Sequence, residues 1–365
     1  MNKFITLLII MFLCLSLSGC WNYHDLDQFY IAAGIAIDKA EDSNLLDVTV
    51  EVINSKETSL QPNIESQIVE SEGVAVFDAV RKMIRISAKK LYFSHATTII
   101  ISEDVAKEGI IPILDWIARD QETRLNMGLF ISKEKTAKEL LTTQSLPTVI
   151  HSFELGRMIT ESKDYINVPI IRIYELINEL AIPKMHSVLP TVEIVNINGK
   201  MTNRISGGAV FNKDKLIGYL VEDDILPYLF LKNQVEKGLL KVIDEKIPQD
   251  KIILEIFKSK TNIKPVFSGE DIKFDLNVST SVNIAELDTS TKIDYLSEQG
   301  RKALRKTAEE NLEADMQKVF KKVQEEFKID IFGFGNQIRM KYPHMWKKIE
   351  KDWDSIFTEL ELNIK

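Results

Sequence analysis

The sequence has almost no cysteine. Only Cys14 and Cys20 occur among 365 residues, and both lie in the first 20. The rest of the chain therefore cannot form an internal disulfide bond or a cysteine-coordinated metal site. A Cys/His catalytic pair in the body is excluded for the same reason.

Motifs that carry enzyme chemistry are also missing. The five histidines show no HExxH spacing, and the chain has no GxSxG, Walker or GxGxxG sequence. Carboxylates are plentiful, so paired-acid catalysis stays open, but no pair stands out. The densest charged cluster, RDQETR at 119–124, is interpreted as a helix end with local ion pairs. We expect no enzyme activity, no cofactor and no metal ion.

The sequence has fewer basic than acidic residues. The formal net charge is −8, with 46 Lys and Arg against 54 Asp and Glu. Binding to nucleic acid needs clustered basic residues, so no nucleic-acid partner is expected. Nor would electrostatics hold this protein on an anionic bilayer, so attachment to a membrane would need another anchor.

Only one long hydrophobic run is present, from Phe4 to Leu17, after Lys3 and before Ser18-Gly19-Cys20. It is too short for an ordinary membrane span, which needs about 20 residues, and its flanks are typical of a secretory leader. Leu17-Ser18-Gly19-Cys20 resembles a bacterial lipobox, although an ordinary leader with a chance cysteine stays open. The lipobox predicts cleavage before Cys20 and a diacylglyceryl group on its thiol.

Strand and helix patterns interleave along the first half. The runs 30–38 and 45–53 indicate a β-hairpin, and 54–72 an exposed polar loop. The run 73–87 indicates a helix with Val76, Val80, Met83 and Ile84 on one face. Further strands are predicted over 90–102, 126–132 and 187–196, with an interrupted helix after residue 102 and mostly helix over 135–182.

The second half begins after the polar segment 198–204, which is the best candidate boundary. We expect a hairpin around NKDK, a helix over 223–235, strands over 250–258 and 271–285, a long amphipathic helix over 298–328 and a final strand over 360–364. Pro343 fits the first position of a further helix that carries Trp346.

The predicted fold class is therefore α+β: several domains of mixed sheets packed with helices, with the long helix against a sheet in the C-terminal domain. The predicted divisions are a lipoprotein signal peptide over 1–19, an N-terminal α+β domain over 20–198 and a C-terminal α+β domain over 199–365. A subdivision near residue 265 is left open.

Several blocks resemble the Ger(x)C lipoproteins, the C subunits of nutrient germinant receptors in endospore-forming bacteria. They are listed in chain order: GCWNYHDLDQFYIAAGIAIDK, KKLYFSHATTIIISEDVAKEGI, LDWIARDQETR, GGAVFNKDKLIGYL and DIFGFGNQIRMKYPHMWKKIEKDWDSIF. The last is the most specific, because Gly333, Gly335, Pro343 and Trp346 fall in the family order. Asn22 stands where the family usually has Asp.

The resemblance implies a non-enzymatic subunit that is needed for nutrient-triggered germination. Cys20 would become an N-palmitoyl, S-diacylglycerol cysteine on the outer leaflet of the inner spore (cell) membrane, and the partners would be two integral membrane subunits. A solute-binding lipoprotein of a transport system is the alternative. An extracellular hydrolase is less favoured, because the motifs it needs are missing.

Overall fold

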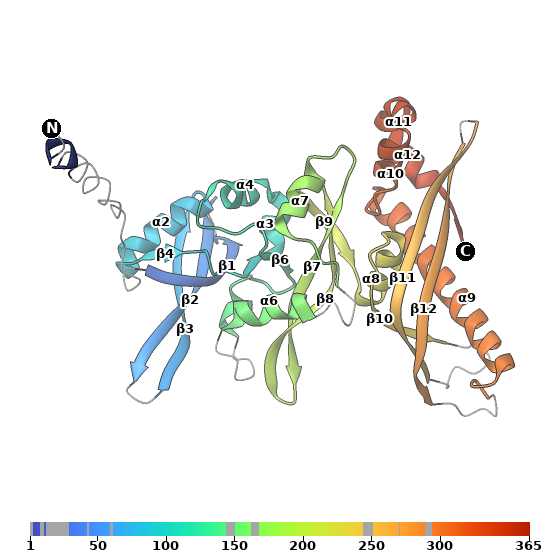
Figure 1. Cartoon of the computed structure of the whole chain (residues 1–365), viewed down its shortest axis with the longest axis horizontal. Coiled ribbons are helices and arrows are strands. Elements are labelled where there is room, and N and C mark those ends of the chain that lie inside the picture. Colours follow the sequence, from blue (N-terminus) through green and yellow to red (C-terminus); the bar gives the residue numbers. More distant parts are fainter. Residues whose placement is uncertain are drawn as a thin grey trace.

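The computed structural model describes residues 3–7, 11, 29–41, 44–58, 61–143, 150–161, 168–243, 251–269, 271–288 and 294–365. Within these ranges the chain forms one sheet of nine strands and one of four, both packed with helices (Figure 1). The predicted α+β fold class is confirmed. Cys20 and the predicted cleavage site lie outside the described residues.

The larger sheet has the strand order β3-β2-β1-β5-β6-β7-β8-β9, and β4 pairs with the start of β1. Its strands are β1 (Phe29–Lys39), β2 (Leu46–Thr58), β3 (Gln61–Gly73), β4 (Lys90–Tyr92), β5 (Thr98–Ile101), β6 (Gly128–Ser132), β7 (Ser187–Ile197), β8 (Lys200–Asn212) and β9 (Lys215–Leu220). The central strands β1, β5, β6 and β7 are parallel, and antiparallel pairs flank them. Central strands covered on both faces explain the continuous apolar runs IAAGIAI and TIII.

Helices cover both faces of this sheet. They are α2 (Val76–Ser87), α3 (Glu103–Glu108), α4 (Ile111–Arg119), α5 (Glu139–Thr142), α6 (His151–Glu161) and α7 (Ile173–Leu180). Ile35 and Ile37 of β1 share a core with α2, α3, α4 and α7, whereas Ala36 packs with α5 and α6 on the other face. The alternation of side chains along β1 thus supplies both layers.

The smaller sheet has the order β10-β11-β12-β13. The C-terminal elements are α8 (Glu222–Leu231), β10 (Gly238–Val242), β11 (Lys251–Ser268), β12 (Asp271–Asp288), α9 (Glu298–Lys322), a π-helical turn (Val323–Phe327), α10 (Phe334–Lys341), α11 (Pro343–Ile349), α12 (Trp353–Glu359) and β13 (Glu361–Ile364). β11 and β12 form a long antiparallel pair, and β13 adds in parallel to β12.

Helix α8 joins the two sheets (Figure 1). It packs against β8 of the larger sheet and against α9 and β11 of the C-terminal part. Its Tyr228 and Phe230 belong to one core together with Val210 of β8 and Phe274 of β12. Apolar contact is therefore continuous from one sheet to the other.

Ion pairs reinforce this junction. Lys322 Nζ of α9 lies 2.6 Å from Asp224 Oδ2 of α8, and Lys184 Nζ lies 2.5 Å from Asp354 Oδ2 of α12. Beside Lys184, the buried His186 accepts a hydrogen bond at Nδ1 from the Lys213 N–H at 3.2 Å. The imidazole therefore carries its single proton on Nε2.

The predicted exposed loop over residues 54–72 is wrong. β2 continues to Thr58, and β3 pairs with it antiparallel along its whole length. β3 lies at the edge of the sheet, so it needs few buried side chains, and Val69 is one of them. An edge strand with little apolar content is hard to tell from a polar loop by sequence.

The boundary predicted after residue 198 falls in a tight turn inside the larger sheet. Asn198 and Gly199 both have positive φ, and β7 and β8 on either side of them are paired. Asn-Gly is a preferred pair for a two-residue hairpin turn, which explains why this polar segment resembles a linker. The sheet continues to β9, and the division into domains 20–198 and 199–365 stays a prediction.

Other differences are smaller. The strand predicted over 90–102 is split into β4 and β5, and the sequence patterns missed β10 and α10. The predicted interruption of the helix after residue 102 is confirmed, because α3 ends before Gly109 and α4 begins at Ile111. Pro343 occupies the start of α11 as predicted.

Burial of His186 predicts that stability depends on pH. Burial, reinforced by Lys184 and Lys213, lowers the pKa of His186 to about 4 against the opposing effect of Asp354. The unfolded chain, whose histidine has a pKa near 6.5, then binds the proton first as the pH falls. The free energy of unfolding should therefore decrease between about pH 6.5 and pH 4, by ~2 kcal/mol at pH 5.

Denaturant titrations at pH 7.5 and pH 5 check this effect. His186→Asn, which keeps an acceptor for the Lys213 N–H, should reduce the difference between the two pH values by ~2 kcal/mol. The exposed His344→Asn is the control and should leave it unchanged. Equal pH dependence in wild type and His186→Asn would contradict the assignment.

Candidate functional site

A buried polar site lies between the end of the π-helical turn and the start of α10. Asp330 is fully buried, and its Oδ1 accepts the N–H groups of Phe332 at 3.0 Å and Gly333 at 2.8 Å. Its Oδ2 accepts the Gly335 N–H at 2.7 Å and the indole N–H of Trp353 at 3.2 Å. Four donors from two separate segments thus meet on one carboxylate.

Burial dominates the electrostatics of Asp330 and raises the pKa of its carboxyl group, although the backbone donors and Trp353 act in the opposite direction. The carboxylate lies at the first turn of α10, where unpaired N–H groups carry partial positive charge. Among the described residues, every hydrogen-bond partner of Asp330 is a donor of this cradle, so the arrangement is suited to fixing the chain rather than to moving protons.

Glycine is needed at two positions of this segment for different physical reasons. Gly333 has φ +81°, and a Cβ added there would come no closer than 3.7 Å to Met185. A Cβ on Gly335 would lie 2.7 Å from Trp353 Nε1 and 3.0 Å from the Trp346 ring. Gly333 therefore supplies a left-handed conformation, and Gly335 supplies close approach of backbone to indole.

Aromatic rings enclose the cradle. Trp346 and Trp353 meet edge to face with their centroids 5.6 Å apart, and Phe334 stacks on Phe274 of β12 at 4.7 Å. Phe320 of α9 lies at 6.1 Å from Phe334. The segment thereby ties α10, α11 and α12 to α9 and to the smaller sheet.

Of the residues singled out in the sequence, Gly333, Gly335 and Trp346 come together here, and Pro343 begins the helix that carries Trp346. Sequence reasoning missed Asp330 and Trp353, although Asp followed by glycine three residues later is a recognisable turn pattern. The assignment of the four residues as a family motif, and of Cys20 as the lipidation site, stays a prediction.

Two other buried carboxylates hold helix starts in the same way. Asp38 of β1 accepts the N–H groups of Ala137 at 2.6 Å and Lys138 at 3.0 Å, before α5. Glu51 of β2 accepts the Ser152 N–H at 2.8 Å and its hydroxyl at 2.6 Å, at the start of α6. Burial is the largest influence on Asp38 and raises its pKa.

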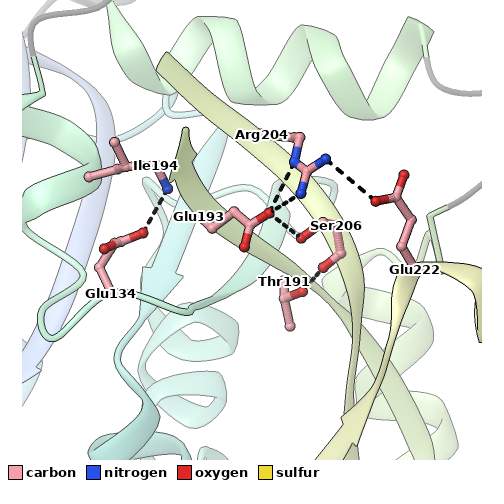
Figure 2. Close-up of polar contacts among 7 residues, drawn as sticks. All are labelled: Glu134, Thr191, Glu193, Ile194, Arg204, Ser206 and Glu222. Carbon is pink, nitrogen blue, oxygen red and sulfur yellow. Dashed lines mark hydrogen bonds and ion pairs between the residues drawn. The ribbon is translucent and has the colours of Figure 1, made fainter. Parts of the chain in front are cut away.

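A more exposed polar cluster links β7 and β8 to α8 (Figure 2). Glu193 Oε1 accepts hydrogen bonds from Arg204 Nη2 at 2.6 Å and Ser206 Oγ at 2.9 Å, and Arg204 Nη1 lies 3.5 Å from Glu222. Partial burial acts to raise the pKa of Glu193, but the bonds from Arg204 and Ser206 outweigh it and lower that pKa. The cluster connects the twisted hairpin to the first residue of α8.

Further donors complete this region. Glu134 Oε1 accepts the Ile194 N–H at 2.7 Å, and the Thr191 hydroxyl donates to the Ser206 carbonyl (Figure 2). Each carboxylate in Figure 2 contacts a backbone or side-chain donor, as expected for groups that position strands.

Among the described residues, no group of three or more His, Cys, Asp or Glu side chains could hold a metal ion. A cavity of about 650 Å³ opens between β12 and α9, with Val278, Leu304 and Leu312 in its lining. Within the part of the chain that the structure describes, no helix is both long and apolar enough to span a bilayer.

Comparisons with known proteins match spore germination proteins in both halves of the chain. The family model described as Spore germination protein N-terminal domain matches residues 22–194, and that described as Spore germination B3/GerAC like, C-terminal matches residues 206–365. The spore germination proteins YndF and B3 of Bacillus subtilis (strain 168) are each 26% identical to this chain. The matches cover 98% and 97% of this chain and 93% of each relative.

Spore germination protein KC of the same organism is also 26% identical, over 96% of this chain and 90% of its own length. Among solved structures, that of the GerBC protein matches with a TM-score of 0.56 and 23% identity, covering 93% of this chain and 98% of that one. At this identity the structural likeness supports the fold alone.

Asp330→Asn should lower the free energy of unfolding by ~2–4 kcal/mol, because an amide nitrogen would replace an acceptor that faces buried donors. Denaturant titration measures the loss, and Asp352→Asn, at an exposed position nearby, is the control. A loss no larger than that of the control would show that the cradle contributes little.

The two glycines should respond differently to alanine. Gly335→Ala should cost ~2–3 kcal/mol and change the near-UV circular dichroism, because the new Cβ displaces Trp353 and Trp346. Gly333→Ala should cost only ~1 kcal/mol, from its positive φ. Gly199→Ala, which has a positive φ and an open surrounding, is the control for strain alone. Equal losses at 333 and 335 would refute the distinction.

Proposed function

The chain belongs to the spore germination B3/GerAC-like family, and on this premise we propose that it is a lipoprotein subunit of a nutrient germinant receptor. Its relatives are spore germination proteins, which supports a role in germination. The observation that carries the proposal is the match of both family models, over residues 22–194 and 206–365. The subunit would act through protein contacts rather than catalysis.

The proposed anchor is lipid on Cys20, which follows the lipobox-like Leu17-Ser18-Gly19. A net charge of −8 argues against electrostatic attachment to an anionic leaflet, so the acyl chains would supply the binding. Strand β1 begins at Phe29, nine residues after Cys20. At about 3.5 Å per extended residue, β1 would start within ~30 Å of the lipid.

The proposed location is the outer leaflet of the inner spore (cell) membrane, beside two integral membrane subunits of the receptor.

The non-catalytic role is supported by the buried carboxylates: Asp38, Glu51 and Asp330 all accept hydrogen bonds from backbone donors. A solute-binding lipoprotein would need two lobes that close on a ligand. The core that α8 makes continuous between the sheets favours a scaffold instead.

Replacement of the anchoring thiol tests the proposal. Cys20→Ala should abolish incorporation of radiolabelled palmitate, move the protein out of the membrane fraction and reduce nutrient-triggered germination. Cys14→Ala is the matched control, because this cysteine lies in the leader that would be removed, and it should label normally. Labelling that persists in Cys20→Ala would overturn the anchor assignment.

A further inference from the structure

A cavity of about 910 Å³ lies beside α6, away from the Asp330 cradle. Four segments form it: the loop after β4, the segment before β6, helix α6, and the start of α7. Its lining residues are His95, Ala96, Thr97, Arg124, Asn126, Met127, Ile150, Phe153, Gly156, Arg157, Thr160, Arg172 and Tyr174.

The charges in this lining differ sharply from those of the whole protein. The chain has 54 acidic residues, yet none of the described residues of the lining is Asp or Glu. Only ten of its 46 basic residues are arginines, yet the lining holds three arginines and no lysine. A cavity lined at random would contain more acidic residues than arginines.

Among the residues that the structure describes, these three arginines have no carboxylate partner, unlike two arginines elsewhere in the chain. Arg119 pairs with Asp115 at 2.8 Å, and Arg204 pairs with Glu193 at 2.6 Å. Among the described residues, no ion pair joins Arg124, Arg157 or Arg172 to a carboxylate. The prediction that RDQETR forms a helix end with local ion pairs therefore fits Arg119 but not Arg124.

One arginine is held in place by the backbone. Arg172 Nη1 donates to the Asn126 carbonyl at 3.2 Å, which joins the segment before β6 to the start of α7. Arg124 precedes Asn126 by two residues, and Arg157 reaches the same cavity from α6. Arginines from three different segments therefore line one cavity.

Like charges that share a cavity repel one another, and an anion between them removes that repulsion. The planar guanidinium group, with its fork of N–H donors, matches the two oxygens of a carboxylate or a phosphate better than lysine does. The cavity volume lies within the range of about 300–1,000 Å³ that is usual for small-molecule sites. We propose that this pocket binds a small anion through a carboxylate or phosphate group.

Titration calorimetry of the purified full chain at low ionic strength, with inorganic phosphate and with succinate, tests the proposal. At least one anion should bind saturably, and Arg124→Gln and Arg157→Gln should each weaken binding by roughly tenfold or more. Arg119→Gln, which removes a paired arginine outside the cavity, is the matched control and should bind as wild type does. Thermal unfolding verifies that each variant is folded.

Vesicle flotation identifies the source of the anionic group. A preference for phosphatidylglycerol over phosphatidylcholine vesicles that Arg157→Gln removes would assign a lipid headgroup. The lipid anchor is common to wild type and variant, so it does not affect this difference. Phosphate or succinate binding without such a preference would assign a soluble anion. Failure of both assays, or binding that Arg124→Gln and Arg157→Gln retain, would overturn the proposal.

Discussion

The buried carboxylate of Asp330 is the interaction on which the C-terminal part of this fold depends most. Removing an ionised carboxylate from water costs several kcal/mol unless donors replace the lost hydration. Here the N–H groups around Gly333 and Gly335 and the indole of Trp353 do so. Because Trp353 follows two intervening helices, one carboxylate fixes both the beginning of α10 and the position of α12.

The larger sheet uses the same solution at two places. Asp38 and Glu51 project from neighbouring strands and hold the N–H groups before α5 and at the start of α6, about 100 residues later in the chain. Helix starts carry unpaired N–H groups and partial positive charge, so a buried carboxylate there is compensated twice. The short helix α5 has little intrinsic stability, and such contacts fix where it lies.

The sequence predicts those elements in which one face is buried, because burial leaves a regular pattern of apolar residues. The hairpin of β1 and β2, the α3–α4 interruption at Gly109 and the long α9 follow from periodicity and from glycine or proline. Edge strand β3 was missed because few of its positions need apolar side chains. A hairpin turn and a linker share the same residue types, which is why the Asn198-Gly199 turn also fits the pattern of a domain boundary.

The sites were less predictable, for a related reason. Gly333, Gly335 and Trp346 stand out within one short segment, but Asp330 acquires its role only when Trp353 packs onto it. The arginine-lined cavity draws on positions 124, 157 and 172, and no local pattern joins residues so far apart in the chain. Periodicity reports which side of an element is buried. It does not report which elements converge.

The position of α8 gives this arrangement a mechanical consequence. A lipid at Cys20 would hold the start of β1, and thus the larger sheet, close to the bilayer, whereas the smaller sheet is joined to it through α8. Tyr228 and Phe230 are buried in a core that both sheets share, and Lys322 pairs with Asp224 at the helix start. Rotation of one sheet against the other would break apolar contacts and an ion pair together. Contacts that partners make with either sheet would therefore act on one connected body rather than on two independent lobes.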